Sequence, residues 1–257
     1  MFFESKVFPM NVLFSIALAG EVIGVSALHD EIRTFCKDYL TDAPESLHVV
    51  ITPTDIASER EKFCRESTAE GFAPVTYSDE YLEALALYRK IAEKLIDRDT
   101  LLFHGSSISV DGEAYLFTAK SGTGKSTHTE LWKKQFGSRA VIINDDKPLL
   151  KLDKQSVTVY GTPWDGKHRR SNNIASPLKA ICILTQSDEN RIQRIDKKAA
   201  MTMLIQQSYR PSDPSALRKT LELVDRLSNS VALYKLGCNM EPEAAQVAYV
   251  GMNQYMA

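Results

Sequence analysis

The sequence lacks the features that mark several large classes of protein. Its four cysteines lie far apart and form no C-x-x-C pair, which argues against a zinc site and favours reduced thiols. No apolar run approaches the length of a membrane-spanning helix. The first residues show no basic segment followed by a long apolar stretch, so they do not resemble a signal peptide. We therefore expect a cytoplasmic location and no membrane partner.

The chain also lacks an excess of charge of either sign. Its 31 basic and 33 acidic residues leave a net charge of −2, too small for a global field that would attract nucleic acid. No internal repeat and no low-complexity linker is present. Hydrophobic residues make up 44% of the chain, enough for one large domain or two small ones with a sizeable core. We expect no nucleic-acid partner.

Hydrophobic periodicity predicts an α/β fold in two parts, an N-terminal α/β segment over residues 1–98 and a core over residues 99–257. Ala19-Gly20-Glu21 has the character of a hairpin turn, and Ser78 is a suitable N-cap for a helix over 79–97. Strands dominate the centre of the chain and helices its end. The expected strands of the core are 101–104, 107–110, 114–118, 140–143, 157–160, 180–184, 191–195 and 231–236, and the expected helices after residue 196 are 197–208, 213–227 and 241–256.

The most informative motif lies between a predicted strand, 114–118, and a predicted helix, 127–136. Glycines let backbone N–H groups turn toward phosphate oxygens, and the N-terminal end of the helix attracts the same anion. Lys125 is expected to reach the β- and γ-phosphates and Ser126 to bind Mg²⁺. The first glycine of the usual pattern is replaced by Ala119. This phosphate-binding loop, or P-loop, consists of Ser121, Gly122, Thr123, Gly124, Lys125, Ser126 and Thr127.

Two adjacent acids, Asp145 and Asp146, follow the apolar run Val141-Ile142-Ile143. A carboxylate at the end of a strand can bind Mg²⁺, and a second one beside it can take a proton from an attacking hydroxyl group. The alternative is an acidic turn that only solvates the end of the strand, since it would also contain two adjacent acids. After a P-loop, the pair favours a functional role in phosphoryl transfer.

Three further features are weaker candidates. His104 follows an apolar run and precedes Gly105, where a satisfied structural histidine is the common alternative to a catalytic one. Arg210 ends a predicted helix, where a cation that complements the helix dipole is favoured over a catalytic role. A loop after the strand 157–160 carries an aromatic residue, an acid and cations that could hold a substrate, although a solvated basic loop is the alternative. These substrate candidates are Trp164, Asp165, Lys167 and Arg169.

Together these residues resemble the core of HPr kinase/phosphorylase, whose fold is shared with ATP-dependent phosphoenolpyruvate carboxykinase. The resemblance rests on His104-Gly105, a hairpin, the P-loop and Asp145-Asp146 in that order. It implies an ATP- and Mg²⁺-dependent phosphotransferase with a P-loop core, a strand-rich centre and C-terminal helices. Lys125 and Ser126 would handle the phosphates and the metal. One aspartate, which we take to be Asp146, would bind Mg²⁺ beside Ser126, and the other would act as the base; the assignment between the two stays open.

The resemblance covers residues 100–150 clearly and extends weakly to residue 185. Residues 1–98 do not resemble the N-terminal domain of HPr kinase, and the glycine-rich stretch that contacts the HPr protein is missing. HPr kinase has glutamate at the position of Thr127, and in this respect the chain is more similar to the carboxykinase loop. The chain is similar to small bacterial HPr-kinase-like proteins. The resemblance is compatible with a homo-oligomer, and the residues show no interface signature.

Three functional hypotheses follow. The favoured one is a kinase that transfers the γ-phosphate of ATP to a hydroxyl group, with a small molecule such as an inositol, a sugar or a hydroxy amino acid preferred to a protein. The alternatives are a serine kinase acting on protein or peptide and a nucleotide-binding regulatory module without phosphotransfer. A carboxykinase is disfavoured, because the chain is short for that enzyme and its full set of substrate ligands is not found.

Overall fold

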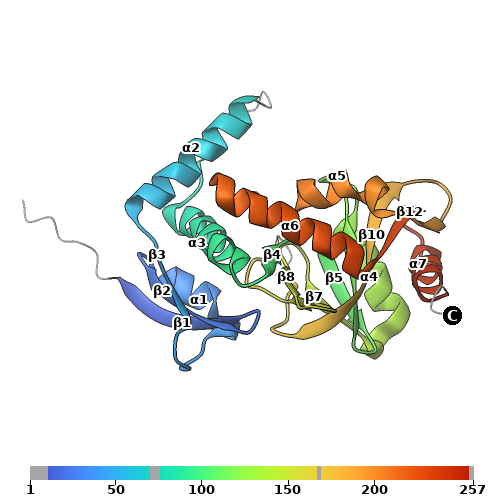
Figure 1. Ribbon diagram of the computed structural model, residues 1–257, viewed down its shortest axis with the longest axis horizontal. Helices are drawn as coiled ribbons and strands as arrows, with labels where there is room; N and C mark the ends of the chain where they lie inside the picture. The colour runs from blue at the N-terminus through green and yellow to red at the C-terminus, as the bar shows by residue number, and fades with distance from the viewer. Residues whose placement is uncertain (1–10, 70–75, 167–168, 255–257) are drawn as a thin grey trace, which may run out of the picture. The chain divides into compact units, whose positions relative to one another are not determined.

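The computed structural model describes residues 11–69, 76–166 and 169–254 and confirms the α/β class (Figure 1). The chain divides into two compact units, Met1–Ile91 and Ala92–Ala257, and the division falls inside helix α3, Asp79–Ile96. None of the described helices is both long and apolar enough to cross a membrane.

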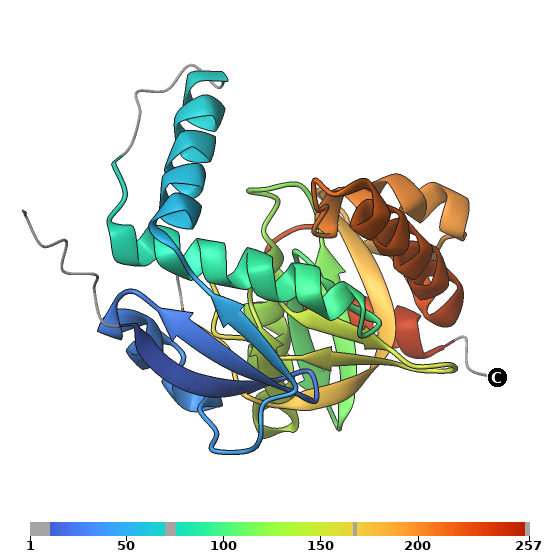
Figure 2. The same ribbon diagram turned by 60° about the vertical axis from the view of Figure 1, so that its left-hand side comes forward.

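The first unit contains a three-stranded sheet in the order β1-β2-β3. The hairpin of β1 and β2, dark blue in Figure 2, turns at Ala19 and Gly20 as predicted. Ser78 caps α3, since its hydroxyl accepts the N–H of Tyr81 at 3.4 Å. The elements before α3 are β1 (Val12–Leu18), β2 (Glu21–Ala27), α1 (Asp30–Phe35), β3 (Leu47–Val50) and α2 (Pro53–Ala69).

The second unit is built on a nine-stranded mixed sheet. The strand order along its main path is β4-β8-β9-β10-β6-β5-β7. Strand β12 lies off this path and pairs with β10 and with β11. The strands are β4 (Thr100–Leu102), β5 (Ser106–Val110), β6 (Glu113–Thr118), β7 (Ala140–Asn144), β8 (Leu149–Leu152), β9 (Val157–Tyr160), β10 (Ala175–Gln186), β11 (Arg191–Arg194) and β12 (Ala232–Cys238). The helices are α4 (Lys125–Phe136), α5 (Lys197–Gln207), α6 (Pro214–Ser230) and α7 (Glu243–Asn253).

Helices cover both faces of this sheet, and the alternation of side chains along each strand explains how. In β6, Leu116 packs in a cluster with residues of α5 and α6, whereas Tyr115 and Phe117 pack in a second cluster with residues of α4 and α7. Successive side chains of a strand point to opposite faces, so one apolar strand supplies both cores. The P-loop helix α4 is therefore held by the second cluster, in which Trp132 is fully buried.

Four strands of the sheet end at one edge. β10 runs parallel to β6 and to β12, and β5 is antiparallel to both β6 and β7. The carboxyl ends of β7, β6, β10 and β12 therefore lie side by side along this edge. The start of β5, which follows His104 and Gly105, lies there too.

The structure also corrects several expected boundaries. Strand β8 was not expected, and β10 begins at Ala175, five residues before the predicted start. The strand predicted over 101–104 ends at Leu102, which leaves His104 in a connecting segment. Arg210 behaves as predicted, because its guanidinium donates to the carbonyls of Ile205 and Gln206 at the end of α5.

Candidate functional site

The predicted strand–loop–helix unit is present. Strand β6 ends at Thr118 and α4 begins at Lys125, so the loop between them is only a few residues long. Gly122 and Gly124 have φ values of 76° and 109°, a left-handed conformation that residues with a Cβ rarely adopt. Left-handed backbone of this kind is typical of loops whose N–H groups form a phosphate-binding concavity.

Lys125 is buried at the first turn of α4. Its ammonium group donates to the carbonyl of Ala119 at 3.4 Å, across the base of the loop. Burial lowers the pKa of Lys125, and the nearby carboxylate of Asp146 opposes that shift. Among the described residues, this carbonyl is the one hydrogen-bond acceptor of the buried ammonium group. The remaining donor capacity is what an anion such as phosphate would satisfy.

One cavity of about 430 Å³, called here the P-loop cavity, brings the predicted groups together. Residues far apart in the sequence meet there because β5, β6 and β7 present their ends at the same edge of the sheet. The lining residues are His104, Ser121, Gly122, Gly124, Lys125, Ser126, Thr127, Asp145, Asp146 and Gly166. Thr123 of the predicted loop does not line it, and its hydroxyl donates to the carbonyl of Lys120 at 2.9 Å.

The two aspartates have different surroundings. Asp145 is buried, and its carboxylate accepts a hydrogen bond of 2.6 Å from the hydroxyl of Ser106. Asp146 is about one-third exposed, with Oδ1 at 3.3 Å from the ammonium of Lys147 and 3.4 Å from Nε2 of His104. Asp145 is thus the more rigidly held of the two, whereas Asp146 is the more accessible to a metal ion.

Asn144 positions Asp146 and Lys147, and sequence reasoning missed it. Its side-chain oxygen accepts the backbone N–H groups of Asp146 and Lys147 at 2.9 and 2.7 Å. Its amide nitrogen donates to the carbonyl and hydroxyl oxygens of Thr162, both at 3.0 Å. The strand end is therefore fastened to the loop after β9. An asparagine at the turn after a strand is a recognisable signal, since its side chain commonly bonds its own backbone two residues on.

Ser106 is a second residue that sequence reasoning did not single out. Its hydroxyl lies 2.5 Å from that of Thr129 on α4, as well as 2.6 Å from Asp145. The three side chains link the start of β5, the P-loop helix and the end of β7. No sequence signal marks this link, because the three residues come from separate elements.

His104 lies in the P-loop cavity beside Asp146. Burial lowers the pKa of His104 to about 4, and the cations of Lys147 and Lys125 contribute to the shift. The imidazole is therefore neutral at physiological pH, and its contact with Asp146 is not an ion pair under those conditions. Its backbone is fixed on both sides, since its N–H donates to the carbonyl of Gln207 and its carbonyl accepts from Thr118.

The loop after β9 meets the P-loop cavity through Gly166, whose φ is +74°. Trp164 is buried, and its carbonyl accepts the N–H of Lys147 at 3.2 Å. Asp165 is also buried; burial raises its pKa, and the hydroxyl of Ser171 donates to it. Among the predicted substrate residues, Arg169 is exposed, and Lys167 lies outside the described residues.

The oxygen donors fit a magnesium ion held jointly with a nucleotide. Ser126 and Asp146 both line the P-loop cavity and offer a hydroxyl and a carboxylate. Mg²⁺ is commonly held by one or two carboxylates, with phosphate oxygens and water in the other positions. Among the described residues, no group of three or more His, Cys, Asp or Glu side chains could hold a metal ion.

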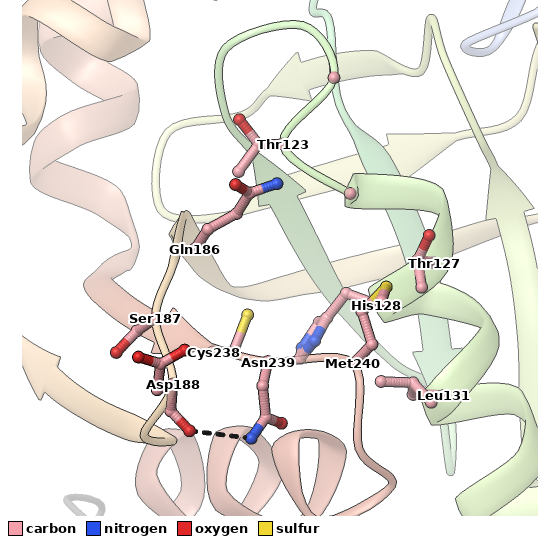
Figure 3. A pocket seen from close by; sticks show the side chains of 12 residues that line it. Thr123, Thr127, His128, Leu131, Gln186, Ser187, Asp188, Cys238, Asn239 and Met240 are labelled. Carbon is pink, nitrogen blue, oxygen red and sulfur yellow. Dashed lines mark hydrogen bonds between the residues drawn. The ribbon is translucent and has the colours of Figure 1, made fainter.

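A second cavity, of about 630 Å³, also borders the P-loop, and we call it the β10/β12 cavity (Figure 3). It shares Gly122, Gly124 and Thr127 with the P-loop cavity. Its other lining residues are Thr123, His128, Leu131, Gln186, Ser187, Asp188, Cys238, Asn239 and Met240.

The fold and the site define an α/β protein with a P-loop at the carboxyl edge of a mixed sheet. The family model that matches residues 78–239 is that of ScmC, described as SynChlorMet cassette protein ScmC. Because this match covers more than half of the chain, the chain belongs to the ScmC family. The matched segment includes the P-loop, Asp145, Asp146 and the loop after β9.

The comparison with solved structures finds a similarity to the Hpr(Ser) kinase/phosphatase from Coxiella burnetii. The two share 10% sequence identity with a TM-score of 0.32, over 60% of this chain and 95% of that chain. The similarity carries no argument about activity. No curated protein matches the sequence.

Proposed function

We propose that the chain is an ATP- and Mg²⁺-dependent kinase that transfers the γ-phosphate to a hydroxyl group. One observation carries the proposal: a single cavity is lined by the P-loop, by both aspartates and by His104. Phosphoryl transfer needs groups that hold the phosphates, a metal ligand and a base within reach of one another. The P-loop cavity supplies all three.

In this proposal, Lys125 and the backbone N–H groups of the P-loop hold the β- and γ-phosphates. Ser126 and Asp146 hold Mg²⁺, which when bound neutralises charge on the phosphates. Asp145 then takes the proton of the acceptor hydroxyl as its oxygen attacks phosphorus; the bond from phosphorus to the bridging oxygen breaks, and ADP leaves. His104 is neutral and offers a hydrogen bond without adding charge beside Asp146.

For the acceptor we favour a small molecule, such as an inositol, a sugar or a hydroxy amino acid. The loop after β9 borders the P-loop cavity at Gly166, and this loop carries Trp164, Asp165, Lys167 and Arg169. Acids bind hydroxyl groups, and cations bind the phosphate of a product. A protein or peptide serine is the alternative acceptor.

The test is transfer of label from radiolabelled ATP to a panel of polyols, sugars and hydroxy amino acids. Lys125→Ala is expected to abolish transfer, because it removes the buried cation from the phosphates. Lys120→Ala is the matched control: Lys120 lies in the same loop, is exposed, and contributes only its carbonyl to the hydrogen bonds of Thr123.

Two other results would change the proposed acceptor or contradict the kinase activity. Lys125-dependent labelling of a protein or peptide, with an unlabelled panel, would replace the small-molecule acceptor by a serine. Tight binding of ATP with no transfer to any acceptor would contradict the kinase and favour a regulatory module.

A further inference from the structure

The β10/β12 cavity has no part in the phosphoryl transfer described above, yet it opens onto the same loop. Gly122, Gly124 and Thr127 line both cavities. A molecule whose phosphates lie on the P-loop can therefore extend into either one. The P-loop cavity contains Asp145 and Asp146, so the reacting end of a nucleotide belongs there. The other end then has the β10/β12 cavity open to it.

The order of strands explains this separation. β7 and the start of β5 bring the aspartates and His104 to one side of β6, whereas β10 and β12 end on the other side. The P-loop follows β6, between the two groups. A nucleotide that lies along the sheet edge would thus have its γ-phosphate at the β7 end and its base at the β12 end.

The β10/β12 cavity is held open by bonds between the two loops that border it. The side-chain amide of Asn239 donates to the carbonyl of Asp188 at 3.0 Å, the dashed line in Figure 3. Its backbone N–H donates to Asn190, whose own amide donates back, both at 3.0 Å. The loop after β10 is thereby tied to the loop after β12, and the space between them is preformed, as ligand sites commonly are.

His128 supplies the second observation. It is 98% buried and lines the β10/β12 cavity, and Figure 3 shows its ring extending from α4 into the space beside the ends of β10 and β12. Its Nε2 accepts the indole N–H of Trp132 at 3.0 Å, so in the neutral ring the proton is on Nδ1. Among the described residues, this Nδ1 has no hydrogen-bond partner. A ligand with an acceptor atom would satisfy it.

The remaining walls suit a flat heteroaromatic ring with polar edges. Leu131 and Met240 offer apolar surface, and Gln186 offers a donor and an acceptor at the end of the cavity near Thr123 (Figure 3). We propose that the β10/β12 cavity binds the base and ribose of the nucleotide whose phosphates occupy the P-loop. This inference rests on the proposed function only in requiring a nucleoside triphosphate, not in requiring transfer.

Cys238 is a built-in probe for the proposal. It lines the β10/β12 cavity and is partly exposed, whereas Cys64, on α2, is exposed far along the chain from either cavity. The rate of alkylation of each thiol is measured by mass spectrometry with Mg²⁺ and either a non-hydrolysable ATP analogue or inorganic tripolyphosphate. At ten times its Kd, the analogue should slow alkylation of Cys238 about tenfold, because about nine-tenths of the protein is then bound. Tripolyphosphate should leave Cys238 unprotected, and neither ligand should protect Cys64.

A substitution gives an independent readout. Gln186 is exposed, and Gln186→Trp would fill one end of the cavity. It should raise the calorimetric Kd of the analogue about tenfold or more, equivalent to about 1.4 kcal/mol. The Kd of tripolyphosphate should not change. Glu189→Trp, in the same loop but outside the lining, is the matched control.

The outcomes separate the inference from the proposed function. If the analogue binds but protects Cys238 no more than tripolyphosphate does, or if Gln186→Trp has no effect on its Kd, the base lies elsewhere and the inference is wrong. If neither ligand binds at all, both the inference and the proposed function are wrong. If the analogue binds as expected and no acceptor is labelled, only the kinase fails.

Discussion

Asp145 and Asp146 are residues of the same type that differ in their structural surroundings. The two are neighbours in the sequence, and the sequence alone does not decide which of them takes the proposed role of metal ligand and which that of base. In the fold, Asp145 is buried against Ser106, and Asp146 faces Lys147 and His104 with more of its surface exposed. The difference favours Asp146 as the metal ligand and Asp145 as the base.

Replacing each aspartate by asparagine tests that assignment. Asp146→Asn should weaken Mg²⁺ binding to the ATP-bound protein by about 10- to 100-fold, because it removes a charged ligand. Asp145→Asn should change Mg²⁺ affinity much less while it abolishes transfer, because the base is lost. Titration of Mg²⁺ at saturating ATP measures the first effect and labelled-phosphate transfer the second. The reverse pattern would exchange the two roles.

His29 and Glu83 form a residue-scale prediction in the first unit. The buried carboxylate of Glu83 accepts from the backbone N–H groups of Leu28 and His29 and from Nδ1 of the His29 ring, at 2.6, 3.1 and 2.6 Å. Burial acts to lower the pKa of His29, but the hydrogen bond and charge of Glu83 outweigh it, and the pKa is raised. Glu83→Ala should lower the free energy of unfolding by about 3 kcal/mol, since it leaves buried donors without a partner.

The sign of the pH dependence follows from the raised pKa. The folded state binds the His29 proton more tightly than the unfolded state, so this contribution is complete below the unfolded pKa. It is lost as pH rises through the folded pKa. Denaturant titrations across about pH 6 to 8 should therefore show a stability decrease that His29→Gln removes. Glu61→Ala, an exposed change on α2, should leave the slope unchanged; an unaltered slope in His29→Gln would contradict the argument.

At the scale of elements, the loop after β9 depends on a glycine at its first position. A Cβ added to Gly161 would lie 1.9 Å from the carbonyl oxygen of Asn172 and 2.8 Å from that of Ile143. Both oxygens belong to the backbone, so a side-chain rotation cannot relieve the clash. Only a residue without a Cβ lets this loop pass close to the end of β7, where Asn144 fastens it.

Gly161→Ala should therefore displace the loop and lower the free energy of unfolding by about 3 kcal/mol or more. Gly112→Ala is the matched control: its φ is +86°, but no described atom lies within 4 Å of the added Cβ. That variant should cost only about 1 kcal/mol, from the left-handed backbone alone. Chemical denaturation of the two variants makes the comparison. Equal losses would mean that the close approach at Gly161 has no energetic weight.

Local patterns predicted individual elements well at this scale. The hairpin at Ala19 and Gly20, the cap at Ser78 and the cation at Arg210 were all found where expected, because each depends on residues within a few positions of one another. Strand β8 and the first part of β10 were missed. Their own residues do not record these pairings: β8 pairs with β9 and with β4, whose paired residues lie about 50 positions earlier, and the first part of β10 pairs with β9.

At the scale of the molecule, the two compact units, Met1–Ile91 and Ala92–Ala257, predict how a nucleotide affects stability. Both cavities are lined by residues of the second unit only. MgATP at about 100 times its Kd should stabilise the folded state of that unit by about 2.7 kcal/mol. Calorimetric scans should show the corresponding transition move to higher temperature in the wild-type protein.

Lys125→Ala should abolish this shift, and Lys120→Ala should preserve it. If the units unfold in separate transitions, the transition of Met1–Ile91 should not move. A nucleotide-induced shift of that transition alone would place the nucleotide site outside the two cavities.

The sequence by itself determined the P-loop, its flanking strand and helix, the paired acids and the α/β class. These follow from short-range chemistry: glycines that permit left-handed backbone, a helix N-terminus and the alternation of apolar residues. Only the tertiary structure decided that His104, Lys125 and Asp146 share one cavity and that β10 and β12 border a second one beside it. Strand order and direction make that decision, and they arise from pairings between segments up to about 65 residues apart, such as Thr118 with Ile183, which no local pattern records.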